Sequence, residues 1–264
     1  MRILLTNDDG FFAPGLQTLY HTLATNPAYE ITIVAPEGQR SAVGHAITLF
    51  EPLFAAKHTL KFGGEGFAVR GTPSDCVKLA LQGDIVFKPD LLISGINLGQ
   101  NLGTDVFYSG TVSAALEGAL LGVPALAVSL ASYEFRDFQP AADFVLKLLR
   151  NLNRISDGGL INVNIPGLPT KDWQGVKLTR LGKAVYENIF ESRKDPRGRI
   201  YYWQSGTLTP DKEEDTDLRA VQEGYISITP MHSDLTDYNR LKSLTDLTEH
   251  LNLTSYKIKN QEYF

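Results

Sequence analysis

The chain has 264 residues, enough for one large domain or two small ones. Its net charge of −5, without any basic run, argues against a stable nucleic-acid partner. No apolar run approaches the roughly 20 residues that a membrane-spanning helix needs, and we expect neither a signal peptide nor a membrane partner. The single cysteine, Cys76, excludes an internal disulfide framework and fits a reducing compartment, so we expect a cytoplasmic protein.

The first ten residues contain the first candidate site. Residues 3–5 form a short apolar run that ends in Asn-Asp-Asp-Gly, which predicts a buried strand followed by two adjacent carboxylates, Asp8 and Asp9. In open α/β sheets, ligands bind beyond the carboxyl ends of the strands. Two neighbouring acids repel each other unless a cation lies between them, and magnesium, manganese and calcium prefer oxygen ligands. A plain Asp-Gly turn is the alternative explanation of these residues taken alone.

Strands and helices alternate through the first 170 residues. The helical spacing of apolar residues predicts helices at 14–23, 73–82, 112–121 and 138–149. Apolar runs predict strands at 3–5, 31–35, 88–94, 123–129 and 159–166, with extended segments at 47–50 and 67–70. This pattern predicts an α/β fold with a Rossmann-like, doubly wound and mostly parallel sheet.

Two predicted loops at one edge of this sheet carry further polar residues. Ser41 follows the strand at 31–35, and Asn97 and Asn101 follow the strand at 88–94 in a glycine-rich loop. Because the carboxyl ends of parallel strands meet at one edge, we expect Ser41 and Asn97 to converge with the two aspartates. Four oxygen ligands with two charges describe a magnesium- or manganese-type site. Considered alone, Ser41 is better explained as a solvated loop serine.

The helix predicted at 112–121 follows three small residues, Ser109, Gly110 and Thr111. Small side chains allow a ligand to approach the backbone, and the free N–H groups and the helix dipole favour an anion there. A divalent metal beside an anion site is what phosphate-ester hydrolysis needs, because the metal polarises a phosphoryl oxygen and the N–H groups neutralise charge. A serine cap on a packed helix explains these residues equally well on its own.

The sequence changes character after about residue 175. Strand-like segments at 176–181, 185–190 and 200–203, with a basic turn at 193–199, predict a β-hairpin that projects from the body. Its run of three aromatic residues would be costly to expose, so we expect a partner subunit to cover it. This run consists of Tyr201, Tyr202 and Trp203. Further along, we expect a solvated acidic loop, a strand and a last helix, at 211–217, 224–230 and 241–251.

Five motifs closely resemble those of the survival protein E (SurE) family of nucleotidases, and the resemblance covers nearly the whole chain. The motifs are residues 3–10 (ILLTNDDG), 41–42 (SA), 71–77 (GTPSDCV), 94–103 (SGINLGQNLG) and 108–115 (YSGTVSAA). Shorter matches follow at 162–166, 179–180 and 227–230. The resemblance implies a metal-dependent phosphatase that hydrolyses nucleoside 5′-monophosphates to nucleoside and phosphate. Some members also act on 3′-monophosphates and short polyphosphate.

The same resemblance implies roles for individual residues, together with one divalent cation per subunit, most simply Mg²⁺ or Mn²⁺. The implied metal ligands are Asp8, Asp9, Ser41 and Asn97. The implied substrate contacts, to the phosphate, are Asn101, Ser109, Gly110 and Thr111. The residues expected to take part in catalysis are Asp8, Asp9, Asn97 and Ser109.

The resemblance also implies an assembly. We expect one SurE-like domain at 1–264, with the Rossmann-like core at 1–170. The remaining residues, 171–264, would supply the β-hairpin and a C-terminal oligomerisation segment that is exchanged between subunits. The expected assembly is a homodimer or homotetramer, and the sequence leaves the choice between them open. It also leaves open the preferred base, the 5′ or 3′ preference, the native metal and the physiological substrate.

Other protein classes with this type of fold require a different sequence motif after the first strand. A dinucleotide-binding oxidoreductase would need a glycine fingerprint where this chain has Asn-Asp-Asp-Gly. A haloacid-dehalogenase-type phosphatase would need Asp-x-Asp, which adjacent aspartates do not provide. A non-catalytic nucleotide-binding module is the alternative that the residues leave open.

A shortage of nucleophiles favours direct hydrolysis by water without a covalent phosphoenzyme. None of the five histidines falls in the motifs, and Cys76 lies inside a predicted helix. Ser109 is the one rival nucleophile in the predicted site, and no base is evident beside it in the sequence. We expect Asp8 or Asp9 to hold the attacking water and accept its proton.

Overall fold

The computed structural model describes residues 1–60, 64–151, 159–187, 189–244 and 247. Met1–His232 forms one compact unit, and Ser233–Phe264 forms a second. Every candidate site residue from the sequence lies in the first unit. The predicted boundary at residue 170 and the predicted exchange of a C-terminal segment between subunits stay predictions.

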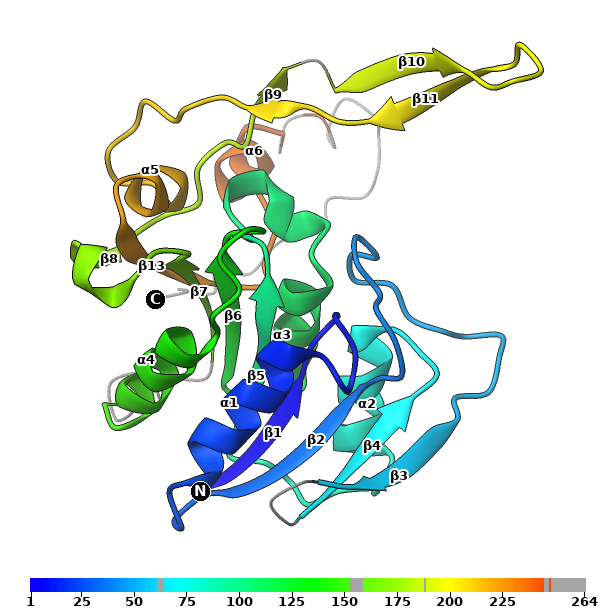
Figure 1. Cartoon of the computed structure of the whole chain (residues 1–264), viewed down its shortest axis with the longest axis vertical. Helices are drawn as coiled ribbons and strands as arrows, with labels where there is room; N and C mark the ends of the chain where they lie inside the picture. Colours follow the sequence, from blue (N-terminus) through cyan, green and yellow to red (C-terminus); the bar gives the residue numbers. More distant parts are fainter. Residues whose placement is uncertain (61–63, 152–158, 188, 245–246, 248–264) are drawn as a thin grey trace. The chain divides into compact units, whose positions relative to one another are not determined.

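A nine-stranded sheet lies at the centre of the described part of the first unit, in the order β3-β4-β2-β1-β5-β6-β7-β13-β8 (Figure 1). Its strands are β1 (Arg2–Thr6), β2 (Glu30–Pro36), β3 (Ala55–Thr59), β4 (Glu65–Val69), β5 (Leu91–Leu98), β6 (Ala125–Ala131), β7 (Leu160–Pro166), β8 (Gly175–Leu178) and β13 (Tyr225–Met231). The six strands from β4 to β7 in this order run parallel, while β3 and β13 are antiparallel to β4 and β7. The predicted, mostly parallel α/β sheet is therefore confirmed.

The order of the parallel strands determines where a ligand can bind. From β1 the chain moves outward through β2 and β4, then returns to β5 and continues outward through β6 and β7. This is the strand order of dinucleotide-binding folds, in which the winding direction reverses between β1 and β5. Ligands bind at such a reversal, beyond the carboxyl ends of the strands. The residues that follow β1 and those that end β5 occupy that position.

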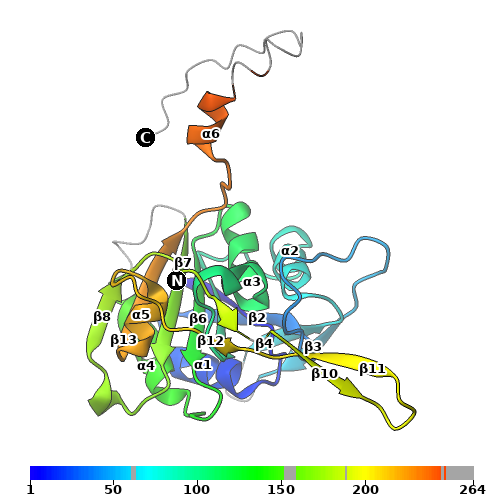
Figure 2. The ribbon, with the colours of Figure 1, turned by 90° about the horizontal axis from the view of Figure 1, so that it is seen from above.

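Helices cover both faces of the sheet, with α1 and α4 on one face and α2 and α3 on the other (Figure 2). The α-helices among the described residues are α1 (Pro14–Ala24), α2 (Pro73–Gln82), α3 (Gly110–Leu120), α4 (Gln139–Leu149), α5 (Asp217–Gln222) and α6 (Tyr238–Ser243). The 3-10 helices among them are η1 (Gly103–Phe107) and η3 (Thr170–Asp172). The helix α6 belongs to the second unit. No helix of the described residues is long and apolar enough to cross a membrane.

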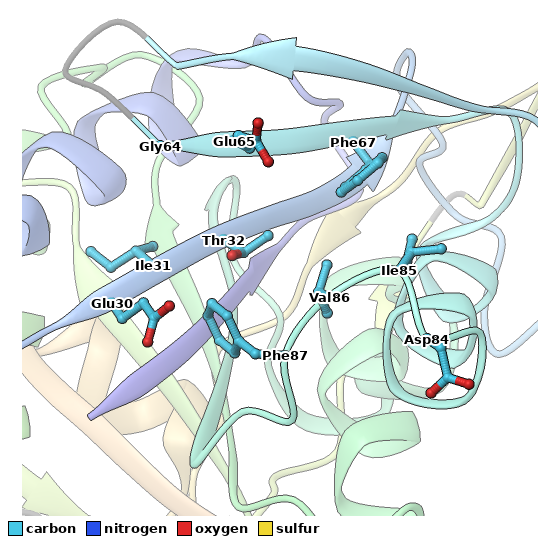
Figure 3. A pocket seen from close by; sticks show the side chains of 10 residues that line it. All are labelled: Glu30, Ile31, Thr32, Gly64, Glu65, Phe67, Asp84, Ile85, Val86 and Phe87. Carbon is cyan, nitrogen blue, oxygen red and sulfur yellow. The ribbon is translucent and has the colours of Figure 1, made fainter.

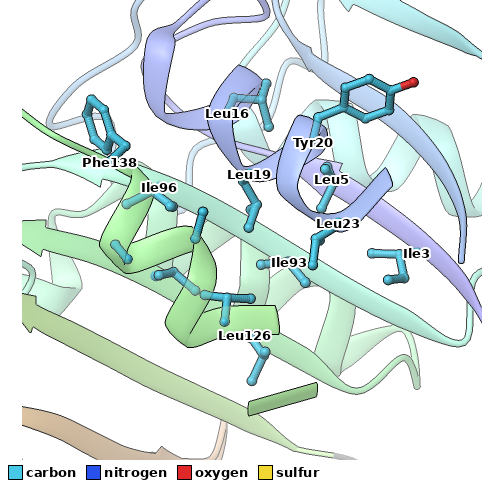
Figure 4. Packing of buried hydrophobic residues seen from close by; sticks show 14 of the residues in the cluster. Ile3, Leu5, Leu16, Leu19, Tyr20, Leu23, Ile93, Ile96, Leu126 and Phe138 are labelled. Atoms are coloured by element: carbon cyan, nitrogen blue, oxygen red, sulfur yellow. The ribbon is translucent and has the colours of Figure 1, made fainter. Parts of the chain in front are cut away.

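Strand β1 shows why its sequence lacks polar alternation. Ile3 and Leu5 pack with Leu19 of α1 (Figure 4). Leu4 joins the cluster formed with α2 and α3 on the other face. All four side chains are fully buried. Each such burial contributes about 1.5–3 kcal/mol to stability, so β1 is held from both sides and its carboxyl end is fixed.

Two differences from the predicted strands concern the sheet. The extended segment predicted at 47–50 is wrong as a strand, because the edge strand is β3, eight residues later. Most of β3 is exposed, so it has no apolar pattern that sequence analysis could detect. Strand β5 also continues beyond the predicted end at Ser94 and includes Asn97.

The predicted β-hairpin is present and projects from the sheet (Figure 1). It consists of β10 (Phe190–Lys194) paired antiparallel with β11 (Ile200–Gln204). At its base, β9 (Tyr186–Glu187) pairs with β12 (Thr207–Leu208). The predicted basic turn at 193–199 is wrong in its first part, because the strand continues through Lys194.

Two predictions near the C-terminus are corrected. The acidic stretch is not wholly a solvated loop, because Asp217 is fully buried and begins α5 after the N-cap Thr216. The last helix begins at Tyr238 rather than Leu241, and α6 ends at Ser243. Most of the predicted range 241–251 lies outside the described residues.

Candidate active site

The turn after β1 places two aspartates at the reversal point of the sheet. Asn7, which is fully buried, closes this turn by accepting a hydrogen bond from the Gly10 N–H and donating one to the Gly10 carbonyl, at 3.1 and 3.0 Å. Gly10 has a φ of +107°, which a residue with a side chain adopts only with strain. The Asp-Gly pair is thus a turn, as the simpler interpretation held. The turn also holds Asp8 and Asp9 at the carboxyl edge.

Asp8 is almost fully buried and lies against the start of α3. The Thr111 hydroxyl donates a hydrogen bond to the Asp8 carboxylate. A Cβ atom added to Gly110 would lie 2.7 Å from the Cβ of Asp8, so only glycine allows this approach. Burial raises the pKa of Asp8 to about 6; the Thr111 hydrogen bond opposes this increase and the charge of Asp9 adds to it.

Asp9 connects the end of β1 with the end of β5. Its carboxylate accepts a hydrogen bond of 3.2 Å from the backbone N–H of Leu98. Burial raises the pKa of Asp9, and this hydrogen bond opposes the increase. The neighbouring Asn97 uses its side-chain N–H₂ to bond the Gly99 carbonyl at 2.8 Å. This bond uses the side-chain nitrogen and leaves the amide oxygen of Asn97 for another partner, and the metal role of Asn97 stays a prediction.

The loop that carries Ser41 follows β2 and touches the same turn. The backbone N–H of Arg40 donates a hydrogen bond of 2.7 Å to the Asp8 carbonyl. Ser41 is the next residue, so its backbone lies close to the turn that carries the two aspartates. The Ser41 side chain is exposed, and its hydroxyl oxygen accepts a hydrogen bond of 2.9 Å from the Gln39 amide. The described contacts do not include one between Ser41 and either aspartate, so its metal role stays a prediction.

Asn101 lies in the loop after β5. It is buried, and its side-chain amide donates to the Ser129 hydroxyl at 2.8 Å. Its backbone is held by two asparagines of β7, because Asn162 and Asn164 donate to its carbonyl and Asn164 accepts from its N–H. This network fixes the loop after β5. Its direct contact with phosphate stays a prediction.

Ser109 is the N-cap of α3. Its hydroxyl oxygen accepts a hydrogen bond of 3.0 Å from the Val112 N–H, so the side chain satisfies one N–H at the helix start. The hydroxyl hydrogen is left to donate to a ligand. Among the described residues, the side-chain hydrogen bond of Ser109 is this one to the helix, and the expected absence of a base beside Ser109 stays a prediction.

A divalent cation fits the donor set at this edge. Asp8 and Asp9 form no ion pair with a described basic side chain, and their raised pKa values reflect burial of negative charge without a counter-charge. A cation would supply that counter-charge. Among the described residues no group of three or more histidine, cysteine or acidic side chains is suited to a metal. A cation site formed by Asp8 and Asp9 would therefore need further ligands from neutral oxygens, such as those of Ser41 and Asn97.

The family described as survival protein SurE matches residues 3–188 of this chain. The chain belongs to the SurE family. The resemblance in the five motifs is thereby confirmed.

Relatives match over most of their length. The chain is 67% identical over 244 residues to 5′-nucleotidase SurE from Desulfitobacterium hafniense (strain DSM 10664 / DCB-2), covering 92% of this chain and 96% of that protein. It is 50% identical over 267 residues to 5′-nucleotidase SurE from Pelotomaculum thermopropionicum, covering 99% of each. The crystal structure of SurE protein from Aquifex aeolicus is similar with a TM-score of 0.80 and 38% identity, covering 94% of this chain and 99% of that one.

A pocket of about 430 Å³ at the opposite edge of the sheet is a poor candidate for the SurE-type site (Figure 3). It lies beside the amino ends of β2 and β4, away from the reversal point. Its lining includes three carboxylates, from Glu30, Glu65 and Asp84. These would repel a phosphate ester, so charge and position both favour the carboxyl edge.

Sequence reasoning missed several buried groups that position this site. Glu117 of α3 bonds His45 at 2.7 Å and Lys78 of α2 at 3.2 Å, which ties the Ser41 loop to two helices. Asp217 accepts hydrogen bonds of 2.8 and 2.9 Å from the Gly103 and Gly182 N–H groups. A glutamate in an otherwise small and apolar helix was the available signal for the first of these contacts. Nothing in the acidic run distinguished Asp217.

Proposed function

We propose that this protein is a metal-dependent phosphatase that hydrolyses nucleoside monophosphates, with 5′-monophosphates as the main substrates. The observation that carries the proposal is the pair of carboxylates at the reversal point of the sheet, Asp8 buried against the start of α3 and Asp9 partly buried against the end of β5. Membership of a family whose relatives are named 5′-nucleotidase supports the reaction and its substrate class.

The proposed metal ligands are Asp8, Asp9, Ser41 and Asn97, with one Mg²⁺ or Mn²⁺ ion per subunit. When bound, such an ion would polarise a phosphoryl oxygen and lower the pKa of the attacking water. Asp8 and Asp9 supply the two negative charges, and the carbonyl oxygen of Asn97 is oriented by the bond from its own amide to Gly99. The identity of the metal and its stoichiometry are part of this proposal.

The proposed phosphate site is the start of α3. Its helix dipole favours an anion, and the hydroxyl hydrogen of Ser109 can donate to a phosphoryl oxygen. Gly110 allows Asp8 to pack closely against the helix start, and Thr111 orients Asp8. Asn101 would line the same site from a loop that is fixed by its buried hydrogen bonds.

Proton transfer in this proposal falls to an aspartate. Burial raises the pKa of Asp8 in the metal-free protein, and a bound cation would lower it again, so the Asp8 carboxylate would be ionised at neutral pH and could accept a proton. Asp9 is more accessible and is the alternative base. Ser109 lacks a bonded base in the described structure, so attack by water on phosphorus, with no phosphoenzyme, accounts for the reaction with the residues present.

The assembly and location are separate parts of the proposal. Exposed aromatic residues on both faces of the hairpin support a homodimer or homotetramer. A single cysteine that is buried and free is consistent with a cytoplasmic location. No observation favours a non-catalytic nucleotide-binding module, because two carboxylates without a metal would repel a nucleotide phosphate.

Phosphate release from a panel of nucleotides tests the function. The purified protein would be stripped with EDTA and then assayed with 5′-AMP, 3′-AMP and tripolyphosphate, with and without Mg²⁺ or Mn²⁺. We expect release from 5′-AMP that depends on added metal. Absence of release with every metal and nucleotide, from protein shown to bind the metal by calorimetry, would contradict the proposed function.

A further inference from the structure

Four exposed aromatic side chains occur on the segments around the proposed site. Phe12 follows the turn after β1, and Phe107 and Tyr108 precede Ser109. Tyr133 follows β6, the neighbour of β5 in the sheet. The exposed fractions of the four residues lie between 59% and 70%. Apolar side chains that gather on a surface commonly mark a binding site, and none of these four has a role in the proposed hydrolysis.

The ring of Phe12 already has packing partners. It lies against Phe11 and against His58 of β3, with distances of 4.9 and 5.3 Å between ring centroids. Phe12 therefore lies towards the outer strands of the sheet.

The loop after β2 borders the site on the side of Tyr108. Its Gly44 N–H bonds the Tyr108 carbonyl at 3.0 Å, and its Arg40 N–H bonds the Asp8 carbonyl at 2.7 Å. The loop thus extends from the aspartate turn to the residue before Ser109. The nucleoside part of a nucleotide bound there is then directed to the opposite side, towards β6.

Tyr133 lies on that side, against the segment that carries Asn97. Gly99 has a φ of +112°, and an added Cβ would lie 2.7–2.8 Å from the Cε1, Cζ and hydroxyl atoms of Tyr133. The hydroxyl end of the ring is therefore in contact with the Gly99 backbone. The carbonyl of the same glycine accepts the 2.8 Å hydrogen bond from the Asn97 amide. The ring and a proposed metal ligand thus share one contact residue.

Hydrogen bonds hold the loop that carries Tyr133. The Ser132 hydroxyl oxygen accepts bonds of 3.1 and 2.9 Å from the N–H groups of Glu134 and Phe135. The Arg136 guanidinium donates a bond of 3.2 Å to the Tyr133 carbonyl. A ring on a loop fixed in this way loses little conformational entropy when a ligand stacks on it.

An exposed and fixed aromatic ring is suited to a nucleobase. Every base has a π face, so stacking on an aromatic side chain adds affinity without selecting strongly among the bases. A sugar phosphate that lacks a base has no such face.

We propose that Tyr133 stacks against the nucleobase of the substrate, and that this contact favours nucleotides over sugar phosphates without a base. The inference rests on the proposed function, since the phosphate must lie at Asp8 and the start of α3. Tyr133 is a specificity-determining residue and takes no part in the hydrolysis itself. The expected preference is for nucleotides as a class rather than for one base.

Two competitors separate the base from the phosphate. Hydrolysis of 5′-AMP would be measured with adenosine, which lacks the phosphate, and with ribose 5-phosphate, which lacks the base. In Tyr133→Leu, the KM for AMP and the inhibition constant for adenosine should each rise roughly tenfold, the loss expected for one stacked base. The kcat for AMP and the inhibition constant for ribose 5-phosphate should stay within about twofold. Tyr133→Phe keeps the ring and should preserve every constant within about twofold.

Phe12→Leu and Tyr108→Leu serve as controls, because each removes another of the four exposed rings. Neither should change the ratio of the two inhibition constants. Equal effects of Tyr133→Leu on both competitors, no effect on either, or a selective loss for adenosine in a control variant instead would overturn the inference while leaving the proposed function intact. Failure of the unchanged protein to hydrolyse AMP would contradict the proposed function and the inference that rests on it.

Discussion

Thr111, the second residue of α3, donates its hydroxyl hydrogen to the carboxylate of Asp8 at the end of β1. This contact connects the helix start, which is expected to bind phosphate, with Asp8, which is expected to be a metal ligand. The helix therefore orients a proposed metal ligand as well as presenting its own N-terminus. A side chain that orients a ligand in this way affects metal affinity before it affects the fold.

Replacing Thr111 by valine tests this orientation. Thr111→Val keeps the branched shape but removes the donor, so we expect metal affinity to fall roughly 10- to 100-fold, as is usual for groups that orient metal ligands. Thr111→Ser keeps the hydroxyl and should restore most of the affinity. Isothermal titration with Mn²⁺ measures both variants. Unchanged affinity in Thr111→Val would show that the hydrogen bond does not orient Asp8 for metal.

Asp8→Asn separates metal binding from folding. The carboxylate is buried beside a second acid, so its removal relieves repulsion and we expect the melting temperature of the metal-free protein to stay the same or rise. Saturating Mg²⁺ should raise the melting temperature of the unchanged protein but not of the variant. Turnover should fall by at least about a hundredfold, since a charged ligand is lost. Near-normal turnover in Asp8→Asn would exclude Asp8 as an essential ligand.

The sequence predicted the strand ends and the helix start that carry the proposed site better than it predicted the segments around them. Buried strands, Asp-Gly turns and helix starts are local signals, so β1, Asp8, Asp9 and the start of α3 were all found. The parallel sheet then placed Asn97 at the same edge. Strand β3 was missed because its residues are exposed on an outer edge, where burial imposes no pattern.

Contacts between distant segments could not be read from the sequence. Glu117 bonds His45, which lies 72 residues earlier, and Asp217 bonds Gly103, which lies 114 residues earlier. Such partners depend on how loops pack after the sheet has formed. The acidic run around Asp217 was expected to be solvated, and only the fold distinguishes its one buried carboxylate from its exposed neighbours.

Asp75 predicts a pH-dependent contribution to stability. Burial raises its pKa, but the hydrogen bonds from Thr48 and Thr72 outweigh burial, and the net pKa is lowered. A carboxylate with a lowered pKa in the folded state stabilises the protein above its unfolded pKa, and this contribution is lost as the pH falls through the folded pKa. Asp75→Asn should therefore lower the free energy of unfolding by about 1–3 kcal/mol at pH 7.

Urea unfolding of the metal-free protein at pH 7, 5 and 3 measures this contribution. The difference between the unchanged protein and Asp75→Asn should persist at pH 5 and shrink towards pH 3. Asp143→Asn, at an exposed position on α4, serves as the control and should have little effect at any pH. A difference for Asp75→Asn that stays constant over this range would argue that the carboxylate charge is not involved.

The hairpin predicts a dependence of assembly on its aromatic residues. Tyr202 lies opposite Ser192 and Trp203 lies opposite Glu191, so successive aromatic side chains point to opposite faces of the two-stranded sheet. Their exposed fractions are 66% and 58%. The double change Tyr202→Ser and Trp203→Ser should reduce the mass measured by light scattering without unfolding the sheet. An unchanged mass would count against a hairpin interface.

The central claim is that water attacks phosphorus directly at the site formed by Asp8 and Asp9. The stereochemical course of hydrolysis tests this most directly. A nucleoside 5′-thiophosphate made chiral with oxygen isotopes at phosphorus would be hydrolysed in isotopically labelled water, and the configuration of the released thiophosphate determined. One in-line attack by water predicts inversion at phosphorus. Retention would require two successive attacks through a phosphoenzyme, and with it a phosphorylated residue such as Ser109, and would contradict the account.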